Sequence, residues 1–259
     1  MPWGKPKFYY EHNLSGLVAT STATGLYDVA NLLDRLEGTF WKAANTTTPM
    51  YITFDAGSGN TVKADYLAIS GHNLNTIGAT IVLQYSTDNF SADINDAFTA
   101  FAPPNDLTLV KEFTSQTKRY WRLKITGTLS AAPYIAICYW GELFELDYCT
   151  VSFDPHAEED NASDIVSHTG VLQEVDEQWT ERAFAIGING VETGGTLDNA
   201  ITTWKTAIGL LNFCVAWNIS AFPNDIWLMR RKKGKFVRPF QKGGLYRNVS
   251  IPLVGRKEI

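Results

Sequence analysis

The sequence predicts a mainly β protein, in which a β-sandwich with a jelly-roll arrangement is followed by a small α+β domain. Short alternating or fully apolar runs, each ended by turn residues, recur between residues 19 and 148. Aromatic residues make up 13% of the chain, and Thr, Val and Ile are frequent, which is typical of pleated, half-buried surfaces. A clear amphipathic helical pattern occurs only in the second part of the chain, near residues 196–209.

Composition sets the broad class of protein. The chain has 259 residues, which allows one large or two ordinary domains, and its 45% hydrophobic and 19% charged content indicates a globular protein. No apolar run reaches the length of a membrane span, and the N-terminal residues lack the apolar segment of a secretory signal, so we expect neither membrane insertion nor export. Cys138, Cys149 and Cys214 form no C-x-x-C pair and are predicted to be free thiols in a reducing compartment.

Charge is distributed unevenly along the chain. Residues 229–259 hold ten of the 22 Lys and Arg but one of the 27 Asp and Glu, so they carry a net charge of +9. The first 228 residues therefore hold 12 basic and 26 acidic side chains, a net charge of −14. An acidic body with a basic C-terminal end favours association with other proteins, or of one copy with another, through long-range attraction.

Residues 1–14 have the character of an N-terminal arm. Pro2 and Pro6 prevent a regular helix there, while large aromatic side chains are costly to leave in water. Such an arm docks either on its own domain or on a neighbouring subunit. The sequence therefore gives one set of candidate partner-binding residues in the arm: Trp3, Phe8, Tyr9 and Tyr10.

Residues 15–148 are predicted to form the sandwich domain. In the strand at 120–126, Trp121, Leu123 and Ile125 alternate with polar residues, and the run 134–140 is continuously apolar, as expected of a strand buried on both faces. A long polar loop is expected at 87–104. The predicted strands are 51–55, 66–70, 80–86, 107–113, 120–126 and 134–140.

Two parts of this segment resemble the discoidin-like family, the jelly-roll module also called the coagulation-factor C-domain type. The first part, near the start of the domain, comprises Asn31-Leu32-Leu33-Asp34, then Trp41, then a strand ended by Asp55 and Gly57. The second part, near the end of the domain, comprises Arg119–Leu123 and Gly141-Glu142-Leu143. The resemblance implies that Trp41 packs in the core rather than serving as a platform for a sugar. It also implies that a sugar site would use loop aromatics at one end of the sandwich, for which the candidates are Tyr27, Phe90, Phe98 and Phe101.

Residues 149–170 are predicted to be an exposed linker, because the acidic run 158–160 follows Asp154-Pro155-His156. His156 and Glu158 form the H-x-E pair that zinc deaminases use, but no P-C-x-x-C follows. An oxygen-rich run of this kind is also found in Ca²⁺ loops, but the EF-hand spacing and its glycine are absent. P-loops, nucleophile elbows and H-E-x-x-H are also missing from the sequence. We therefore expect no enzyme activity, no metal and no cofactor.

Residues 171–259 are predicted to form the small α+β, split-barrel-like domain. Thr196 is a candidate N-cap of its helix, and Gly209 a candidate end. Strands are expected at 171–189, as two strands or one long bent strand, and at 212–218, 225–232, 235–240 and 245–254. Lys233 and Gly234 would form the turn of a hairpin between the third and fourth of these.

The basic run at 230–235 is the second candidate partner-binding segment. A nucleic-acid partner is disfavoured, because the field of the acidic body opposes a polyanion. The remaining interpretations are a solvated hairpin tip and a protein–protein contact. The residues concerned are Arg230, Arg231, Lys232, Lys233 and Lys235.

In overall character the whole chain resembles distal-tail or baseplate proteins of bacteriophages. The hypothesis is a non-enzymatic structural or adaptor protein of a phage tail tip, assembled in the host cytoplasm into the virion, homo-oligomeric, and in contact with other tail proteins and with a host glycan. The alternative is a carbohydrate-binding module protein that recognises cell-surface glycans. A third class, an intracellular enzyme, would need a site that the motifs do not reveal.

Overall fold

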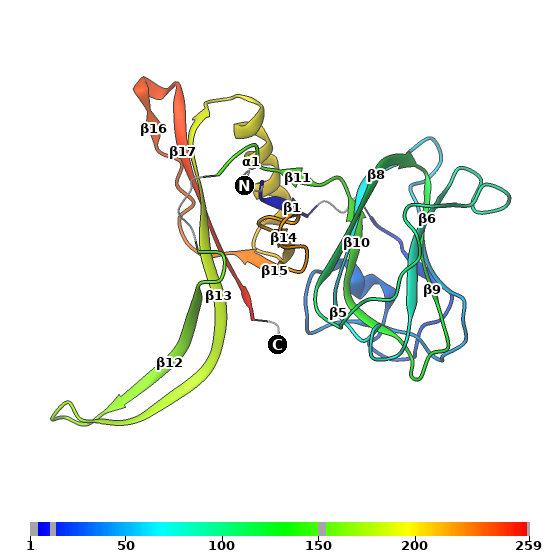
Figure 1. Cartoon of the computed structure of the whole chain (residues 1–259), viewed down its shortest axis with the longest axis horizontal. Coiled ribbons are helices and arrows are strands. Elements are labelled where there is room, and N and C mark those ends of the chain that lie inside the picture. The colour runs from blue at the N-terminus through cyan, green and yellow to red at the C-terminus, as the bar shows by residue number, and fades with distance from the viewer. Residues whose placement is uncertain (1–4, 11–13, 150–153, 258–259) are drawn as a thin grey trace.

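The computed structural model describes residues 5–10, 14–149 and 154–257, and the chain forms two mainly β domains that lie side by side (Figure 1). The sandwich is built from the first part of the chain and the second domain from the last part. The short strand β1 (Lys7–Tyr9) near the N-terminus belongs to the sheet of the second domain. The chain therefore crosses between the domains twice, once after β1 and once after the last strand of the sandwich.

The first domain is a sandwich of two antiparallel sheets. The five-stranded sheet has the order β2-β4-β9-β6-β7, with bounds Val18–Ala19, Met50–Asp55, Tyr120–Thr126, Thr80–Ser86 and Asn95–Asp96. The four-stranded sheet has the order β3-β10-β5-β8, with bounds Trp41–Lys42, Tyr134–Gly141, Val62–His72 and Leu109–Lys118. A short 3-10 helix, η1 (Val29–Leu33), precedes β3. This arrangement is the jelly-roll β-sandwich that the alternating strands predict.

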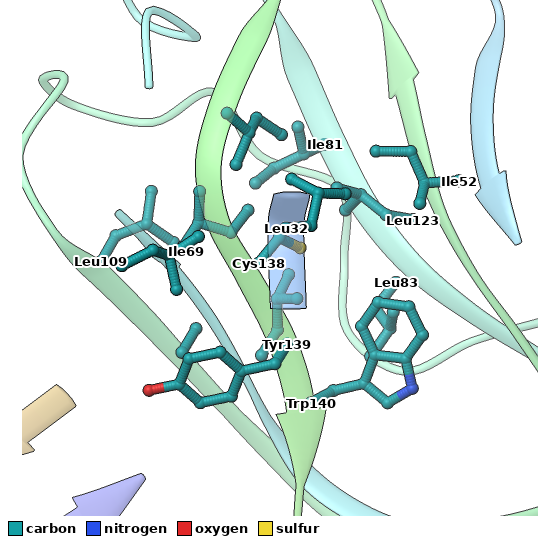
Figure 2. Close-up of a cluster of buried hydrophobic side chains, with 14 of the residues drawn as sticks. Leu32, Ile52, Ile69, Ile81, Leu83, Leu109, Leu123, Cys138, Tyr139 and Trp140 are labelled. Atoms are coloured by element: carbon teal, nitrogen blue, oxygen red, sulfur yellow. The ribbon is translucent and has the colours of Figure 1, made fainter. Parts of the chain in front are cut away.

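The core of the sandwich lies between its two sheets. Figure 2 shows side chains of both sheets meeting, with Leu123 and Leu83 from one and Ile69 and Cys138 from the other, and Leu32 of η1 among them. Burial of the apolar members of β9 follows the predicted alternation, since every second residue of this strand is buried. β10 is buried along nearly its whole length, as its continuous apolar run predicts.

Trp41 is fully buried, which confirms its predicted place in the core. Its indole Nε1 donates hydrogen bonds to the Ser21 carbonyl oxygen at 3.2 Å and to the Thr22 hydroxyl at 3.1 Å. The ring thus ties the segment before η1 to the edge of the four-stranded sheet. The buried indole also leaves no free face for a ligand.

The second domain contains one large antiparallel sheet and one helix. The strand order is β11-β1-β14-β15-β17-β13-β12, and β16 pairs beside β17. The strands not yet placed are β11 (Phe144–Glu145), β12 (Glu158–Val166), β13 (Leu172–Glu192), β14 (Phe213–Ala216), β15 (Ile226–Arg231), β16 (Phe240–Gln241) and β17 (Tyr246–Arg256).

The helix α1 (Thr196–Ile208) is followed by its C-cap Gly209, as predicted. Its N-cap is Gly195 and not the predicted Thr196, which is the first residue of the helix. Ile201, Trp204 and Ile208 are buried against the sheet, because they recur at helical spacing. Asp198 in the first turn is buried and pairs with Arg238 at 2.6 Å.

β12 and β13 form a long hairpin that projects from the second domain (Figure 1). Residues 158–170, which the sequence assigns to a linker, therefore belong to the sheet up to Val166. The sequence does not indicate this strand, because nearly all side chains of β12 are exposed and apolar residues therefore do not alternate with polar ones. β12 is the edge strand of the sheet, and its inward-facing backbone groups pair with β13, which is one long strand rather than two.

The basic run also differs from its prediction. Arg230 and Arg231 lie within β15, which pairs with β14 and β17, and residues 232–239 form no strand. The hairpin turn is instead the 3-10 segment η2 (Lys242–Gly244) between β16 and β17. Positive φ angles at Gly243 and Gly244 allow this turn.

The arm contributes to the core and not to an exposed surface. Phe8, Tyr9 and Tyr10 are buried within the chain, because β1 pairs with β11 and β14 and its rings pack on both domains. This placement matches the alternative in which the arm docks on its own chain, and it leaves these three side chains little exposed surface for a partner. Trp3 lies outside the described residues.

Hydrogen bonds around Tyr139 join the two domains. The hydroxyl of Tyr139, on β10, donates to the Tyr9 carbonyl oxygen at 2.7 Å and accepts from the Cys214 backbone nitrogen at 3.0 Å. Arg35 adds a second link, since its Nη2 donates to the Tyr10 carbonyl oxygen at 2.5 Å and its own carbonyl oxygen accepts from Asn212 at 3.0 Å. The sandwich is therefore held to the second domain by buried bonds. None of the helices among the described residues has the length and apolar content needed to cross a membrane.

Candidate ligand cleft between the two domains

Two adjoining hollows lie between the sandwich and the second domain. The first has a volume of about 420 Å³. Its sandwich wall is the start of β8 with the loop before it, and its other wall comes from β13, β15 and the loop that precedes β15. Its main lining residues are Phe101, Leu107, Thr108, Lys111, Arg182, Pro223, Ile226 and Trp227.

The second hollow is larger, at about 880 Å³, and more open. Asn105 and Leu107 line both hollows, so the two are neighbours, and we call them together the interdomain cleft. The lining residues of this part are Gly71, Asn105, Asp106, Leu107, Trp179, Thr180, Arg256 and Lys257. Aromatic, basic and amide side chains thus meet in one groove.

The sandwich wall is a loop held rigid by polar contacts. Asp106 Oδ1 accepts from the Asn75 backbone nitrogen at 2.7 Å, and the Asn75 side chain donates to the Pro103 carbonyl oxygen at 2.8 Å. His72 lies beneath, with Nε2 3.0 Å from the Leu107 carbonyl oxygen and Nδ1 accepting from the Leu74 backbone nitrogen at 3.2 Å.

These contacts fix the tautomer of His72, because a carbonyl oxygen can only accept and a backbone nitrogen can only donate. The proton therefore lies on Nε2 and the ring is neutral. Burial lowers the pKa of His72, against the opposing effect of nearby Asp106. His72 supports the loop and does not reach the cleft.

The opposite wall is built around Trp227. The Arg182 guanidinium lies over its ring, with Cζ 4.1 Å from the ring centroid, and burial lowers the pKa of Arg182. His156 meets the same ring edge-on at 5.5 Å. One side of this indole is therefore covered, and it acts as a wall of the cleft.

His156 is fixed by two charged neighbours. Its Nε2 lies 3.3 Å from Asp225 Oδ2, and its Nδ1 lies 3.3 Å from Arg182 Nη1. Because a guanidinium only donates, Nδ1 accepts and the proton lies on Nε2, facing the carboxylate. Asp225 also accepts from the Trp217 indole at 3.0 Å. The sequence could not reveal this cluster, because its members are far apart in the chain.

Trp179 gives the cleft its open aromatic surface. This side chain on β13 is 54% exposed. Beside it, Arg256 Nη2 contacts Glu37 Oε1 at 3.0 Å and Lys257 Nζ contacts Glu158 Oε1 at 2.9 Å, so both cations are anchored at the rim. A flat apolar ring with anchored donors and the carboxylate of Asp106 suits a ligand that has both an apolar face and hydroxyl groups.

The four loop aromatics expected from the sequence do not meet at one site. Phe101 alone lines the cleft. Phe98 packs on Phe101 at 5.8 Å against the core, and Phe90 covers Arg122 at 4.0 Å on the outer face of the five-stranded sheet. The remaining candidate, Tyr27, packs on Phe40 at 5.1 Å, and Phe40 in turn packs on Tyr134 at 5.5 Å.

Three of the five basic candidates in the run 230–235 are engaged within the chain. Arg230 lies 3.6 Å from Glu181 and Lys232 lies 2.6 Å from Glu159, while Arg231 lies over the Phe236 ring. Lys233 and Lys235 are exposed. In the part of the chain that the structure describes, no cluster of three or more His, Cys, Asp or Glu is placed to hold a metal ion.

No protein-family model matches the sequence, and no curated protein matches it. Solved structures similar to part of the chain include chitosan-binding module 1 of a chitosanase/glucanase from Paenibacillus sp. IK-5. Its V110M mutant is 14% identical with a TM-score of 0.42, covering 51% of this chain and 99% of the module. A carbohydrate-binding module from Clostridium perfringens in complex with GalNAc-β-1,3-galactose is 16% identical with a TM-score of 0.41. The match covers 49% of this chain and 94% of the module.

A GH29 fucosidase of Ruminococcus gnavus in complex with fucose is 15% identical with a TM-score of 0.41; the match covers 49% of this chain and 25% of the fucosidase. Each likeness thus reaches about half of the present chain. Identities and TM-scores of this size assign neither a ligand nor an activity to it.

Proposed function

We propose that this protein is a non-enzymatic glycan-binding protein and that the interdomain cleft holds the sugar. The observation that carries the proposal is the placement of the exposed Trp179 indole beside Arg256, Lys257, Asn105 and Asp106 in one groove. The apolar face of a sugar ring packs on an indole, while its hydroxyl groups donate and accept hydrogen bonds. This site differs from the loop aromatics that the resemblance to discoidin-like modules implies.

Binding to a panel of glycans, followed by calorimetry on the best ligand, tests the proposal. Trp179→Ala should weaken binding at least tenfold, because it removes the open stacking surface. Tyr134→Ala is the matched control, since Tyr134 is a partly exposed aromatic residue outside the cleft. Loss of binding in Tyr134→Ala with unchanged binding in Trp179→Ala would move the site to the Tyr27, Phe40 and Tyr134 cluster and refute the proposal.

Absence of catalysis is the second part of the proposal. His156 is paired on both ring nitrogens, with Arg182 and Asp225, so its proton is held in a structural contact. Assays of glycosides, esters and nucleosides should therefore give no turnover with the wild type, and none should depend on His156. A turnover that disappears in His156→Ala, with folding unchanged by circular dichroism, would overturn the non-enzymatic assignment.

A structural role in a phage tail tip or baseplate is a second candidate function, and the projecting β12–β13 hairpin favours it. A hairpin that extends from its domain with exposed apolar side chains is expected to gain stability by contact with other subunits. The protein would then display its glycan-binding cleft on a virion assembled in the host cytoplasm. Co-purification of the tagged chain with the products of neighbouring genes tests this role, and the chain's absence from purified virions would contradict it.

A further inference from the structure

Two surface patches lie at opposite ends of the large sheet, and neither is used by the cleft. The acidic hairpin patch is the outer half of the β12–β13 hairpin. It carries four exposed carboxylates, Asp164, Glu174, Asp176 and Glu177. Its apolar side chains are 48–61% exposed and comprise Ile165, Val166, Val171, Leu172 and Val175.

The second surface, which we call the basic tip patch, surrounds the β16–β17 hairpin and the loop before it. It carries three exposed cations, Lys233, Lys235 and Lys242. Its apolar side chains are 38–68% exposed and comprise Val237, Phe240, Leu245 and Tyr246. Within the described residues, neither the four carboxylates nor these three lysines form an ion pair.

The two patches cannot meet within one molecule. β13 connects them, since its first residue Leu172 pairs near the hairpin tip and its last residue Glu192 pairs with Tyr246. A strand of 21 residues spans roughly 70 Å. Figure 1 accordingly shows the β16–β17 tip at one end of the sheet and the β12–β13 tip at the other.

Charge decides which surfaces can pair. Two hairpin patches facing one another would place four carboxylates against four, and two basic tips would oppose three lysines to three, so contacts between like patches are disfavoured. Contact between unlike patches joins carboxylates to lysines and covers the apolar side chains of both. A second copy of the chain supplies the complementary surface.

We propose that the acidic hairpin patch of one copy docks on the basic tip patch of a second copy, in a head-to-tail contact. Because the contact uses two different surfaces, each copy keeps one free patch for a further neighbour, so the contacts close into a ring or continue as a chain. The proposal rests on the assembly role given above as the second candidate function and is independent of glycan binding.

Two charge-reversed forms of the full chain test this contact. The first carries Asp164→Lys, Glu174→Lys, Asp176→Lys and Glu177→Lys, which makes its hairpin patch basic. The second carries Lys233→Glu, Lys235→Glu and Lys242→Glu, which makes its tip patch acidic. Light scattering and sedimentation of the wild type should give masses above 28.8 kDa that rise with concentration.

Each reversed form alone should remain a monomer, since its two patches then carry the same sign. A mixture of the two should associate, because a hairpin-to-tip contact between one form and the other again joins opposite charges. A matched control for the second form is Lys63→Glu, Lys118→Glu and Lys124→Glu on the sandwich, which lowers the net charge by the same amount and should leave association unchanged. Raised salt should slow the association of the wild type.

Several outcomes overturn the proposal. A wild type that stays monomeric at high concentration refutes it, and if that monomer still binds products of neighbouring genes, the assembly role survives without self-association. The second form, with the acidic tip patch, keeps its hairpin patch unchanged. If it associates alone as strongly as the wild type, then hairpins pair with hairpins or other surfaces are used, and the proposal is wrong. A mixture that remains monomeric contradicts the pairing of the two patches.

Discussion

At the scale of single residues, one hydroxyl group connects three distant parts of the chain. Tyr139 is buried in the sandwich, and its oxygen reaches Tyr9 on β1 and Cys214 on β14. Burial raises the pKa of Tyr139 well above its ordinary value, so the hydroxyl keeps its proton for the bond to Tyr9. The sequence marks this residue only as part of an apolar strand, because a hydrogen bond across 130 residues leaves no local pattern.

Trp41→Ala should lower the free energy of unfolding by about 3–5 kcal/mol, as for other large aromatic residues truncated in cores. The change removes a fully buried ring and its two hydrogen bonds to the segment before η1. Urea unfolding followed by circular dichroism measures the effect. Val18→Ala on the exposed edge strand β2 is the control, and an equally small loss in both variants would contradict the core role of Trp41.

At the scale of elements, the sequence reveals strands with alternating or continuous apolar residues and misses a strand that is polar on both faces. β6 and β9 have their predicted bounds. Alternating apolar and polar residues mark such strands, and turn residues mark where they end. β12 has acidic and exposed residues on both faces, so it is mistaken for a linker. The turn of the last hairpin is also misplaced, because the Gly-Gly pair of η2 outweighs Lys233-Gly234 as a turn former.

The first turn of α1 contains Asp198, whose buried ion pairs cannot be predicted from the helix sequence alone. Asp198 Oδ1 contacts Arg238 at 2.6 Å and Oδ2 contacts Arg247 at 3.5 Å. Asp198→Ala should cost about 2–4 kcal/mol, because it leaves two partly buried guanidinium groups without their carboxylate. Thr203→Ala on the exposed side of the same helix is the matched control. Thermal unfolding compares the two, and equal midpoints would contradict the role of the pair.

At the scale of the whole molecule, the candidate site exists only because the two domains are held together. Its walls come from the loop at 105–107 and from β13, β15 and β17, which lie far apart in the sequence. Local patterns predict most strands of the sandwich and the helix of the second domain, whereas the bonds of Tyr139 and Arg35 link the two domains. No periodicity or spacing predicts the meeting of Trp179 with Asp106, so the sequence leads to loop aromatics instead of the cleft.

Hydrogen–deuterium exchange of the whole chain, with and without its best-binding glycan, tests the central claim most directly. If the sugar occupies the interdomain cleft, amides on both walls should gain protection together, at 105–111 on the sandwich and at 179–182 and 226–227 on the second domain. Segments far from the cleft, such as 22–30, should exchange unchanged. Protection confined to the loops around Tyr27 and Tyr134, with the cleft segments unaffected at saturating glycan, would contradict the account.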